Sequence, residues 1–348
     1  MNIPERDLGT VNDLSFEGKM LVGTLCALFA WTDDAHLLAR ASRTMDRTTL
    51  GRASGVRMLQ APPPLAYELL RGSDIKEGDP VSAHPTCVML HGILGSRRNL
   101  FSFAQRMRNE FPSWQFLLVD LRCHGQTSAM AEPPGGANTV EASALDVIGV
   151  LSHLNVYPTM LMGHSFGGKV VMSMIEQTKG SLPRRVQAWV LDTVPGDVFV
   201  EGGDHPKDTI NFVRTLQMPL ESRKSLVDQL TGAGFTHEGS QWMATNLKPD
   251  PSGGLTWTFD IAGIAEMYVS YENIDLWPWL ETQPKLLDVD FVRAERSAFV
   301  WTEEDLRRIE AYGSRVHFLR DSSHWVHIDN PEGLLEIIAP SFLALGPR

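Results

Sequence analysis

From Thr86 onward, short apolar runs alternate with longer amphipathic segments, and this alternation limits the folds that the chain can adopt. The apolar runs are typical of strands buried on both faces, and they cover residues 86–90, 116–119, 159–162, 186–191, 286–292 and 316–319. Segments with the spacing of helices lie at residues 99–110, 140–154, 166–177 and 331–343. Because parallel strands need crossover connections, which are usually helices, the pattern predicts an α/β fold with a mostly parallel sheet flanked by helices.

One long segment breaks this alternation. It contains helical stretches at 208–216 and 221–230, Gly-rich turns and many aromatic side chains, and we interpret it as a helical cap inserted into the sheet domain. Three consecutive prolines end at Pro64, and successive prolines continue neither a helix nor a central strand. The predicted organisation has three parts: an N-terminal extension (1–64), a core in two pieces (65–194 and 285–348) and the cap (195–284).

The N-terminal extension bears on where the protein resides. Its longest apolar run, residues 20–31, is shorter than the roughly 17–25 residues that span a bilayer, so no transmembrane segment is predicted. Residues 40–57 are rich in Arg, Ser and Thr with Asp46 as their only acid, a composition that organelle transit peptides share. Acids among the first twenty residues fit such a peptide poorly, so a disordered or loosely helical extension is the alternative.

Charge and cysteine usage exclude several classes of protein. The chain has 31 Lys and Arg against 42 Asp and Glu, a formal net charge of −11; nucleic-acid binding is not expected, because cationic side chains on phosphates supply that affinity. Cys26, Cys87 and Cys123 form no paired motif, which favours a reducing, intracellular compartment, in a mitochondrion or plastid if the extension is a transit peptide. No metal-ligand cluster or Gly-rich phosphate loop is recognisable, so neither a metal nor a cofactor is predicted.

The strongest local signal is Gly163-His164-Ser165-Phe166-Gly167, between a predicted strand and a predicted helix. A G-x-S-x-G sequence in that setting is typical of a sharp turn that projects the serine outward. The two glycines let the backbone pass closely at the turn. Ser165 is therefore the candidate nucleophile.

A serine hydroxyl is a weak nucleophile without a neighbouring base. Two histidines compete for that role: His324, in the loop after the last predicted strand, and His327, further toward the last helix. A loop at the carboxyl end of a strand can reach the turn that carries Ser165. We therefore prefer His324 as the general base and expect His327 to pack or hydrogen bond locally.

A nucleophilic serine also needs hydrogen-bond donors for the oxyanion of the tetrahedral intermediate. The sequence His-Gly-Ile-Leu-Gly at residues 91–95 follows the first strongly apolar strand. The expected donors are the backbone N–H groups of Ile93 in this loop and of Phe166, next to the nucleophile. His91 is expected to brace the loop rather than to act as a base.

Four segments, taken in chain order, resemble the α/β-hydrolase superfamily, in particular the bacterial short-chain acyl esterases and the abhydrolase domain eleven proteins. These segments are His91-Gly92-Ile93-Leu94-Gly95-Ser96, Asp120-Leu121-Arg122-Cys123-His124-Gly125, Gly163-His164-Ser165-Phe166-Gly167-Gly168-Lys169 and His324-Trp325-Val326-His327. The resemblance spans residues 65–345 and implies the α/β-hydrolase fold with an inserted helical cap. Cys123 departs from the family pattern, which usually has glycine there, and it is expected to alter the mouth of the pocket.

The resemblance also bears on the acid that should orient His324. Many relatives place it after the strand at 286–292, where this chain has Glu295, and Ala298 stands where an aspartate is often found. In the resembling esterase branch the acid follows the strand after the nucleophile helix, which corresponds here to Asp192. A carboxylate there would hold the imidazole in the required tautomer, so Asp192 is preferred and Glu295 is the alternative.

The resemblance implies a serine esterase or thioesterase acting on small-molecule esters or thioesters of short-to-medium acyl length. Ser165 would form an acyl-enzyme, and some cap aromatics would line the acyl pocket. Dehalogenases and epoxide hydrolases of this fold use an aspartate nucleophile, where this chain has Ser165. Two alternatives stay open, because a fold does not determine a function: a non-hydrolytic ligand- or partner-binding protein on the same scaffold, and a C–C bond hydrolase.

Overall fold

The structure is a computed structural model that describes residues 64–178, 184–282 and 285–347. The predictions for the N-terminal extension, apart from its last residue, therefore lie outside the described residues. Within the ranges given, no helix is both long and apolar enough to cross a membrane.

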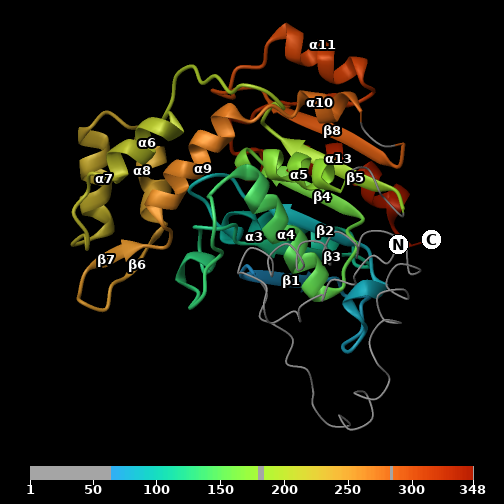
Figure 1. Ribbon diagram of the computed structural model, residues 1–348, viewed down its shortest axis with the longest axis horizontal. Coiled ribbons are helices and arrows are strands. Elements are labelled where there is room, and N and C mark those ends of the chain that lie inside the picture. Colours follow the sequence, from blue (N-terminus) through green and yellow to red (C-terminus); the bar gives the residue numbers. More distant parts are fainter. Residues whose placement is uncertain (1–63, 179–183, 283–284, 348) are drawn as a thin grey trace, which may run out of the picture. The chain divides into compact units, whose positions relative to one another are not determined.

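A seven-stranded sheet forms the centre of the fold, in the order β1-β3-β2-β4-β5-β8-β9 (Figure 1). Its strands are β1 (Tyr67–Arg71), β2 (Thr86–Leu90), β3 (Gln115–Val119), β4 (Met160–His164), β5 (Val186–Leu191), β8 (Leu287–Ala294) and β9 (Arg315–Leu319). Only β1 is antiparallel to its neighbour, β3, and the remaining pairs are parallel. The predicted mostly parallel sheet is confirmed, because each parallel strand forms from one of the apolar runs.

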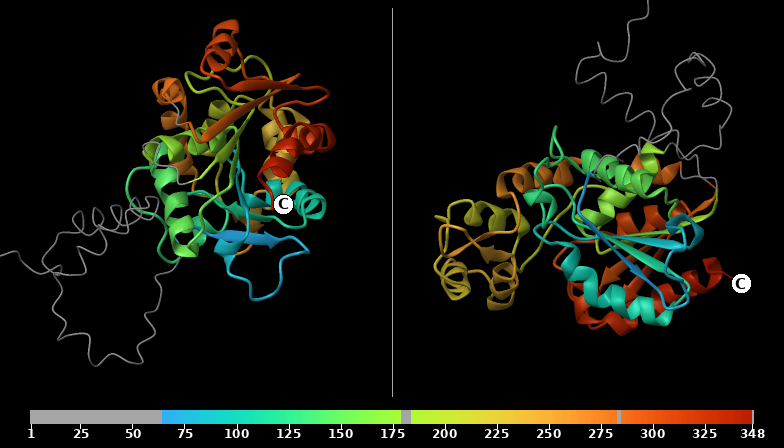
Figure 2. Two further views of the ribbon diagram at one scale, coloured as in Figure 1. Left: turned by 90° about the vertical axis from the view of Figure 1, so that its right-hand side faces the viewer. Right: turned by 90° about the horizontal axis from the view of Figure 1, so that it is seen from below.

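Helices cover both faces of this sheet. Figure 2 shows α3 and α13 on one face, with α4 and α5 on the other. The helices between and after the sheet strands are α3 (Arg97–Glu110), α4 (Val140–Leu154), α5 (Phe166–Gln177), α11 (Glu303–Ala311), α12 (Val326–Asp329) and α13 (Pro331–Leu345). Two single 3-10 turns lie at Val81–Ala83 and Thr127–Ala129.

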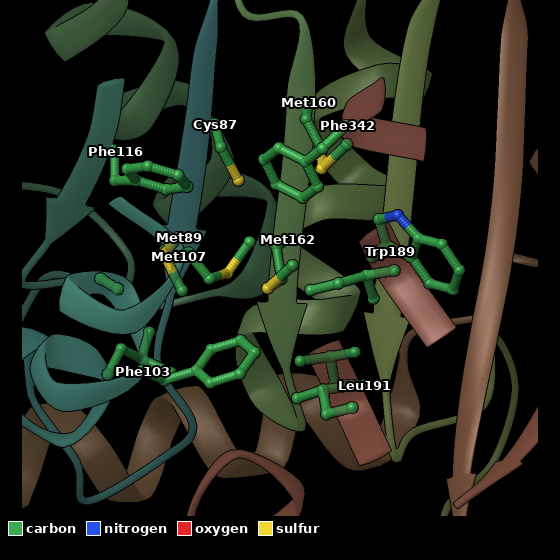
Figure 3. Packing of buried hydrophobic residues seen from close by; sticks show 14 of the residues in the cluster. Cys87, Met89, Phe103, Met107, Phe116, Met160, Met162, Trp189, Leu191 and Phe342 are labelled. Atoms are coloured by element: carbon green, nitrogen blue, oxygen red, sulfur yellow. The ribbon is translucent and has the colours of Figure 1, made fainter. Parts of the chain in front are cut away.

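The main hydrophobic cluster fills the space between the sheet and the pair α3 and α13. Figure 3 shows Met89, Met162 and Trp189 projecting from neighbouring strands into this layer. Phe342 of α13 stacks on Phe111 at a ring-centroid separation of 4.5 Å. Burying one such large side chain contributes about 1.5–3 kcal/mol, and this packing fixes the strands whose carboxyl ends carry the candidate site.

The chain leaves the sheet between β5 and β8, and we call residues 195–282 the inserted segment. Its elements are α6 (Pro206–Val213), α7 (Arg223–Gly232), α8 (His237–Ala244), β6 (Leu247–Pro249), β7 (Leu255–Trp257), α9 (Ile261–Asn273) and α10 (Trp277–Glu281). Figure 1 shows α6, α7, α8 and the β6–β7 hairpin grouped beyond one end of the sheet, with α9 leading back to it. The hairpin was not predicted, and the division into core and cap domains stays a prediction.

Cys123 is packed against α9 of the inserted segment. Its φ of +63° lies in the left-handed region that favours glycine, which gives a physical reason for the glycine usual in the resembling family. Opposite the thiol lies Gly263, where an added Cβ would come within 2.3 Å of Cys123 Sγ. The Cys123 side chain thus occupies space that Gly263 of α9 leaves open.

We expect Gly263→Ala to destabilise the protein by about 1–3 kcal/mol, because the new methyl group overpacks this contact. Adding Cys123→Gly should recover most of that loss, since it removes the clashing thiol. Urea unfolding of both single variants and of the double variant measures the coupling. Equal destabilisation by Gly263→Ala in the presence and absence of Cys123 would refute the contact.

Candidate active site

Ser165 lies at the sharp turn between β4 and α5. Its backbone has φ 52° and ψ −118°, a sparsely populated conformation whose strain costs about 1–3 kcal/mol and is most often found at functional sites. The Ser165 N–H donates to the Leu191 carbonyl at 2.8 Å, which ties the turn to the end of β5. The side chain therefore stands at the carboxyl edge of the sheet, where the predicted nucleophile was expected.

The glycines beside Ser165 are required by close backbone contacts. A Cβ on Gly163 would lie 2.1 Å from the Gly167 carbonyl oxygen, and one on Gly167 would lie 2.5 Å from the Leu90 carbonyl oxygen. Real Cβ atoms do not approach backbone so closely. Any larger residue at either position would displace the turn, which explains the spacing of the glycines around Ser165.

His324 and Asp192 meet at this edge of the sheet. His324 Nδ1 is 2.7 Å from Asp192 Oδ2. Asp192 directly follows β5 and is fully buried, and its carboxylate also accepts hydrogen bonds from the Ala294 N–H (3.1 Å) and the Ser297 hydroxyl (2.5 Å). A buried carboxylate with three donors is satisfied as an anion, and it fixes the Nδ1 proton of His324.

The two alternatives considered from the sequence lie elsewhere. Glu295 is exposed, and its carboxylate accepts from the backbone N–H of Asp321 rather than from His324. His327 is buried, and neither of its ring nitrogens has a hydrogen-bond partner among the described residues. The structure therefore brings His324 together with Asp192 and not with Glu295.

Further contacts hold the His324 ring and main chain. Phe299 stacks on the imidazole at a centroid separation of 4.3 Å and an angle of 27°. The His164 ring donates through Nε2 to the His324 carbonyl at 2.7 Å. Sequence reasoning missed Ser297 and Phe299, since neither belongs to a recognisable motif; both lie in the loop that follows β8.

Two buried histidines cross-link the loop at 91–95 to the loop that follows β3. His91 Nε2 accepts from the Leu121 N–H, and His124 Nε2 accepts from the Leu94 N–H, both at 3.1 Å. Each ring donates through Nδ1, to the carbonyls of Gly92 and Arg122 respectively. A ring that accepts at one nitrogen and donates at the other is neutral, and His91 has the bracing position expected for it.

Burial lowers the pKa of His91, His124, His164 and His327 below the ordinary value of 6.5, in His327 to about 4. Repulsion between neighbouring imidazoles, which would act if both were protonated, adds to the lowering of the pKa in His124, His164 and His327. Protonation of any of these rings would place a charge in a buried site. The native state therefore holds them in the neutral form at neutral pH.

We expect the free energy of unfolding to fall as the pH drops below 6.5. Between the native and the unfolded pKa the unfolded chain binds more protons, so acid favours unfolding. His327 alone accounts for about 3 kcal/mol by pH 4. Urea unfolding at a series of pH values below 6.5 measures how steeply the free energy of unfolding changes with pH. His327→Leu should make that dependence shallower. An equal slope in that variant would contradict a neutral buried His327.

A cavity of about 270 Å³ opens beside Ser165 and His324. The core contributes Gly92, Ile93 and Leu94 to one wall. Side chains of the inserted segment form the opposite wall, and the apolar ones include Leu230, Phe235, Trp242 and Met243. The arrangement places a small, mostly apolar chamber beside Ser165.

Residues 87–337 match the model of the Alpha/beta hydrolase family. The sn-1-specific diacylglycerol lipase ABHD11 of Mus musculus is 28% identical over 290 residues, which cover 81% of this chain and 86% of the relative. Esterase YbfF of Escherichia coli (strain K12) is 25% identical over 255 residues, 72% of this chain and 90% of the relative.

Solved structures give the same fold. One described as a marine microorganism esterase superposes with a TM-score of 0.63 at 19% identity, over 80% of this chain and 99% of that one. At this level of identity the match supports the fold alone.

Proposed function

The chain belongs to the alpha/beta hydrolase family, and we propose that it hydrolyses carboxylic esters or thioesters of short-to-medium acyl groups with Ser165 as the nucleophile. The observation that carries the proposal is the 2.7 Å contact between His324 Nδ1 and the buried Asp192. In the neutral imidazole that contact places the proton on Nδ1, so that Nε2 can accept a proton. Relatives named as an esterase and as a diacylglycerol lipase support ester cleavage.

In the proposed reaction the Ser165 Oγ attacks the carbonyl carbon while His324 Nε2 takes the hydroxyl proton. The leaving alcohol or thiol receives that proton from His324 as the carbonyl–heteroatom bond breaks. Water then attacks the acyl-enzyme with the same histidine as base, and His324 returns the proton to Ser165 Oγ as the acyl–oxygen bond breaks and the carboxylic acid is released. Asp192 stabilises the imidazolium that forms in each half of the reaction.

The oxyanion is assigned to the N–H groups of Phe166 and Ile93. Phe166 is the first residue of α5, so its N–H has no carbonyl partner within the helix, and the positive end of the helix dipole adds to its effect. In the loop, the Leu94 N–H donates to His124 and the Gly95 N–H to Gly92. Because the N–H groups of Leu94 and Gly95 are already hydrogen bonded, Ile93 is supported as the donor from that loop.

The acyl group is assigned to the cavity between the core and the inserted segment. Its apolar wall, which includes Leu230, Trp242 and Met243, fits a hydrocarbon chain better than a charged group. In this proposal the inserted segment acts as the cap of the enzyme. The volume of this cavity then limits the length of the acyl chain that the enzyme accepts.

The first test is labelling of the purified full-length chain with a fluorophosphonate probe, with the modified residue located by mass spectrometry. Modification at Ser165 in the unaltered chain, and its loss in Ser165→Ala, is the expected result. Ser323→Ala is the matched control, because Ser323 lines the same cavity while its hydroxyl is hydrogen bonded to Asp329. It should label like the unaltered chain.

A folded chain that binds small esters without labelling at Ser165 would overturn the proposal and favour a non-hydrolytic binding protein. Where labelling succeeds, a series of esters and thioesters of increasing acyl length defines the substrate. Turnover of carbon–carbon substrates in preference to that series would also contradict ester hydrolysis.

A further inference from the structure

A second cavity, of about 580 Å³, adjoins the one beside Ser165. From the core, residues 92–94 line the first cavity and residues 96–99 line the second. From the inserted segment, Met243 lines the first cavity and Asn246 lines the second. The two cavities therefore follow one another along the same boundary between the core and the inserted segment.

Trp242 of α8 stands between these two cavities. Among the described residues it alone lines both of them. Its ring packs against Trp325, which directly follows His324, with the ring centroids 4.5 Å apart. The indole Nε1 is buried and has no hydrogen-bond partner among the described residues, so packing holds the ring in place. A large, flat aromatic side chain thus forms the partition between the cavities.

The inserted segment that carries Trp242 is anchored at two points to α5, the helix that begins directly after Ser165. Lys169 of α5 is fully buried and donates through Nζ to the carbonyl oxygens of Gly196 (2.6 Å) and Tyr271 (2.8 Å). Gly196 lies at the start of the segment and Tyr271 near the end of α9. A buried ammonium group needs such acceptors. This contact therefore stabilises the position of the segment relative to the candidate nucleophile.

We propose that Trp242 sets the upper limit of acyl length, because its ring separates the acyl cavity from the second cavity. This inference rests on the proposed function, in which Ser165 is the nucleophile and the acyl chain occupies the first cavity. A chain that fills the first cavity meets the indole ring and cannot extend into the space beyond it. The partition also keeps an apolar chain away from Arg98 and Lys248, which line the second cavity.

The test is Trp242→Ala, assayed with p-nitrophenyl esters of increasing acyl length. Each kcat/KM is divided by that of the acetyl ester in the same variant, so that any loss of folded protein cancels. In the unaltered chain this ratio should stop rising once the acyl chain reaches the partition. In Trp242→Ala it should continue to rise over further carbons, by about two- to fourfold for each methylene group removed from water. Labelling rates at Ser165 with alkyl fluorophosphonates of the same lengths should follow the same pattern.

Met243→Ala is the matched control, since Met243 is the next residue of α8 and lines the first cavity but not the second. It enlarges the acyl cavity without opening the partition, so the length limit should move by no more than the volume of its own side chain allows. Ala129 lines only the second cavity. Ala129→Phe should leave the length profile of the otherwise unaltered chain unchanged. Added to Trp242→Ala, it should remove much of the gain with long chains, because it fills the space beyond the partition.

Trp242→Phe should extend the length limit less than Trp242→Ala does, and it keeps the inference testable if the alanine variant folds poorly. An unchanged length profile in both variants would overturn the inference, as would an equal extension in Met243→Ala. A gain in Trp242→Ala that Ala129→Phe does not reduce would place the longer chains outside the second cavity and would also overturn it. Absence of labelling at Ser165 in the unaltered chain would instead refute the proposed function, so the two failures are distinct.

Discussion

Asp192→Asn is expected to lower kcat by about 10⁴-fold, the effect of holding a catalytic imidazole in the wrong tautomer. Three donors converge on Asp192, from Ala294, Ser297 and His324. An amide offers one oxygen and one NH₂ group in place of two acceptor oxygens, so its NH₂ would face His324 Nδ1. The ring would then move its proton to Nε2 and could not accept one from Ser165.

Initial rates of p-nitrophenyl ester hydrolysis measure this effect, and Glu295→Gln is the matched control. The glutamine keeps an oxygen for the Asp321 N–H that Glu295 binds, so its kcat should stay close to that of the unaltered chain. A loss in Glu295→Gln as large as that in Asp192→Asn would show that the acid had been assigned wrongly.

His324→Ala is expected to lower kcat by at least about 10⁴-fold, because the hydroxyl of Ser165 then has no base. The substitution removes the imidazole but keeps the carbonyl oxygen that accepts from His164. The local main chain therefore retains its contact, and KM for a small ester should change little. Single-turnover rates with p-nitrophenyl esters separate the chemical step from binding.

His327→Leu is the control for this prediction. Leucine is apolar and suits the buried site, where the two ring nitrogens of His327 lack partners among the described residues. Its kcat at neutral pH should resemble that of the unaltered chain. If His327→Leu lost activity and His324→Ala kept it, the assignment of the base would have to be reversed.

The central fold could be predicted because its strands are buried on both faces. The runs at β2 and β5 consist almost wholly of apolar residues, and α4 and α5 have the bounds expected from their patterns. β1 lies at the edge of the sheet and includes Glu68 and Arg71, so it lacks such a run. α11 is mostly charged on its exposed face. Its sequence also lacks a clear apolar pattern, so it was not among the predicted helices.

The candidate site could be predicted only where its residues belong to local motifs. Ser165 is flanked by glycines, and His324 follows the last strand. Ser297 and Phe299 contact Asp192 and His324, and no local pattern marks either of them. Lys169 is a signal for the docking of the inserted segment, because a lysine in the buried start of α5 needs buried acceptors, and it finds them in the carbonyls of Gly196 and Tyr271.

The contact between Lys169 Nζ and the Tyr271 carbonyl near the end of α9 has a consequence for exchanging the inserted segment between relatives to obtain new substrate ranges. Lys169 binds main-chain oxygens of Gly196 and Tyr271, so it recognises where the foreign helix ends and not its sequence. A graft that preserves the length of the last turn should dock correctly with many different side chains. A graft shifted by one residue would turn the terminal carbonyl by about 100° around the helix axis, away from Lys169 Nζ. Its loss of activity would then come from misplacement of the segment and not from the new pocket.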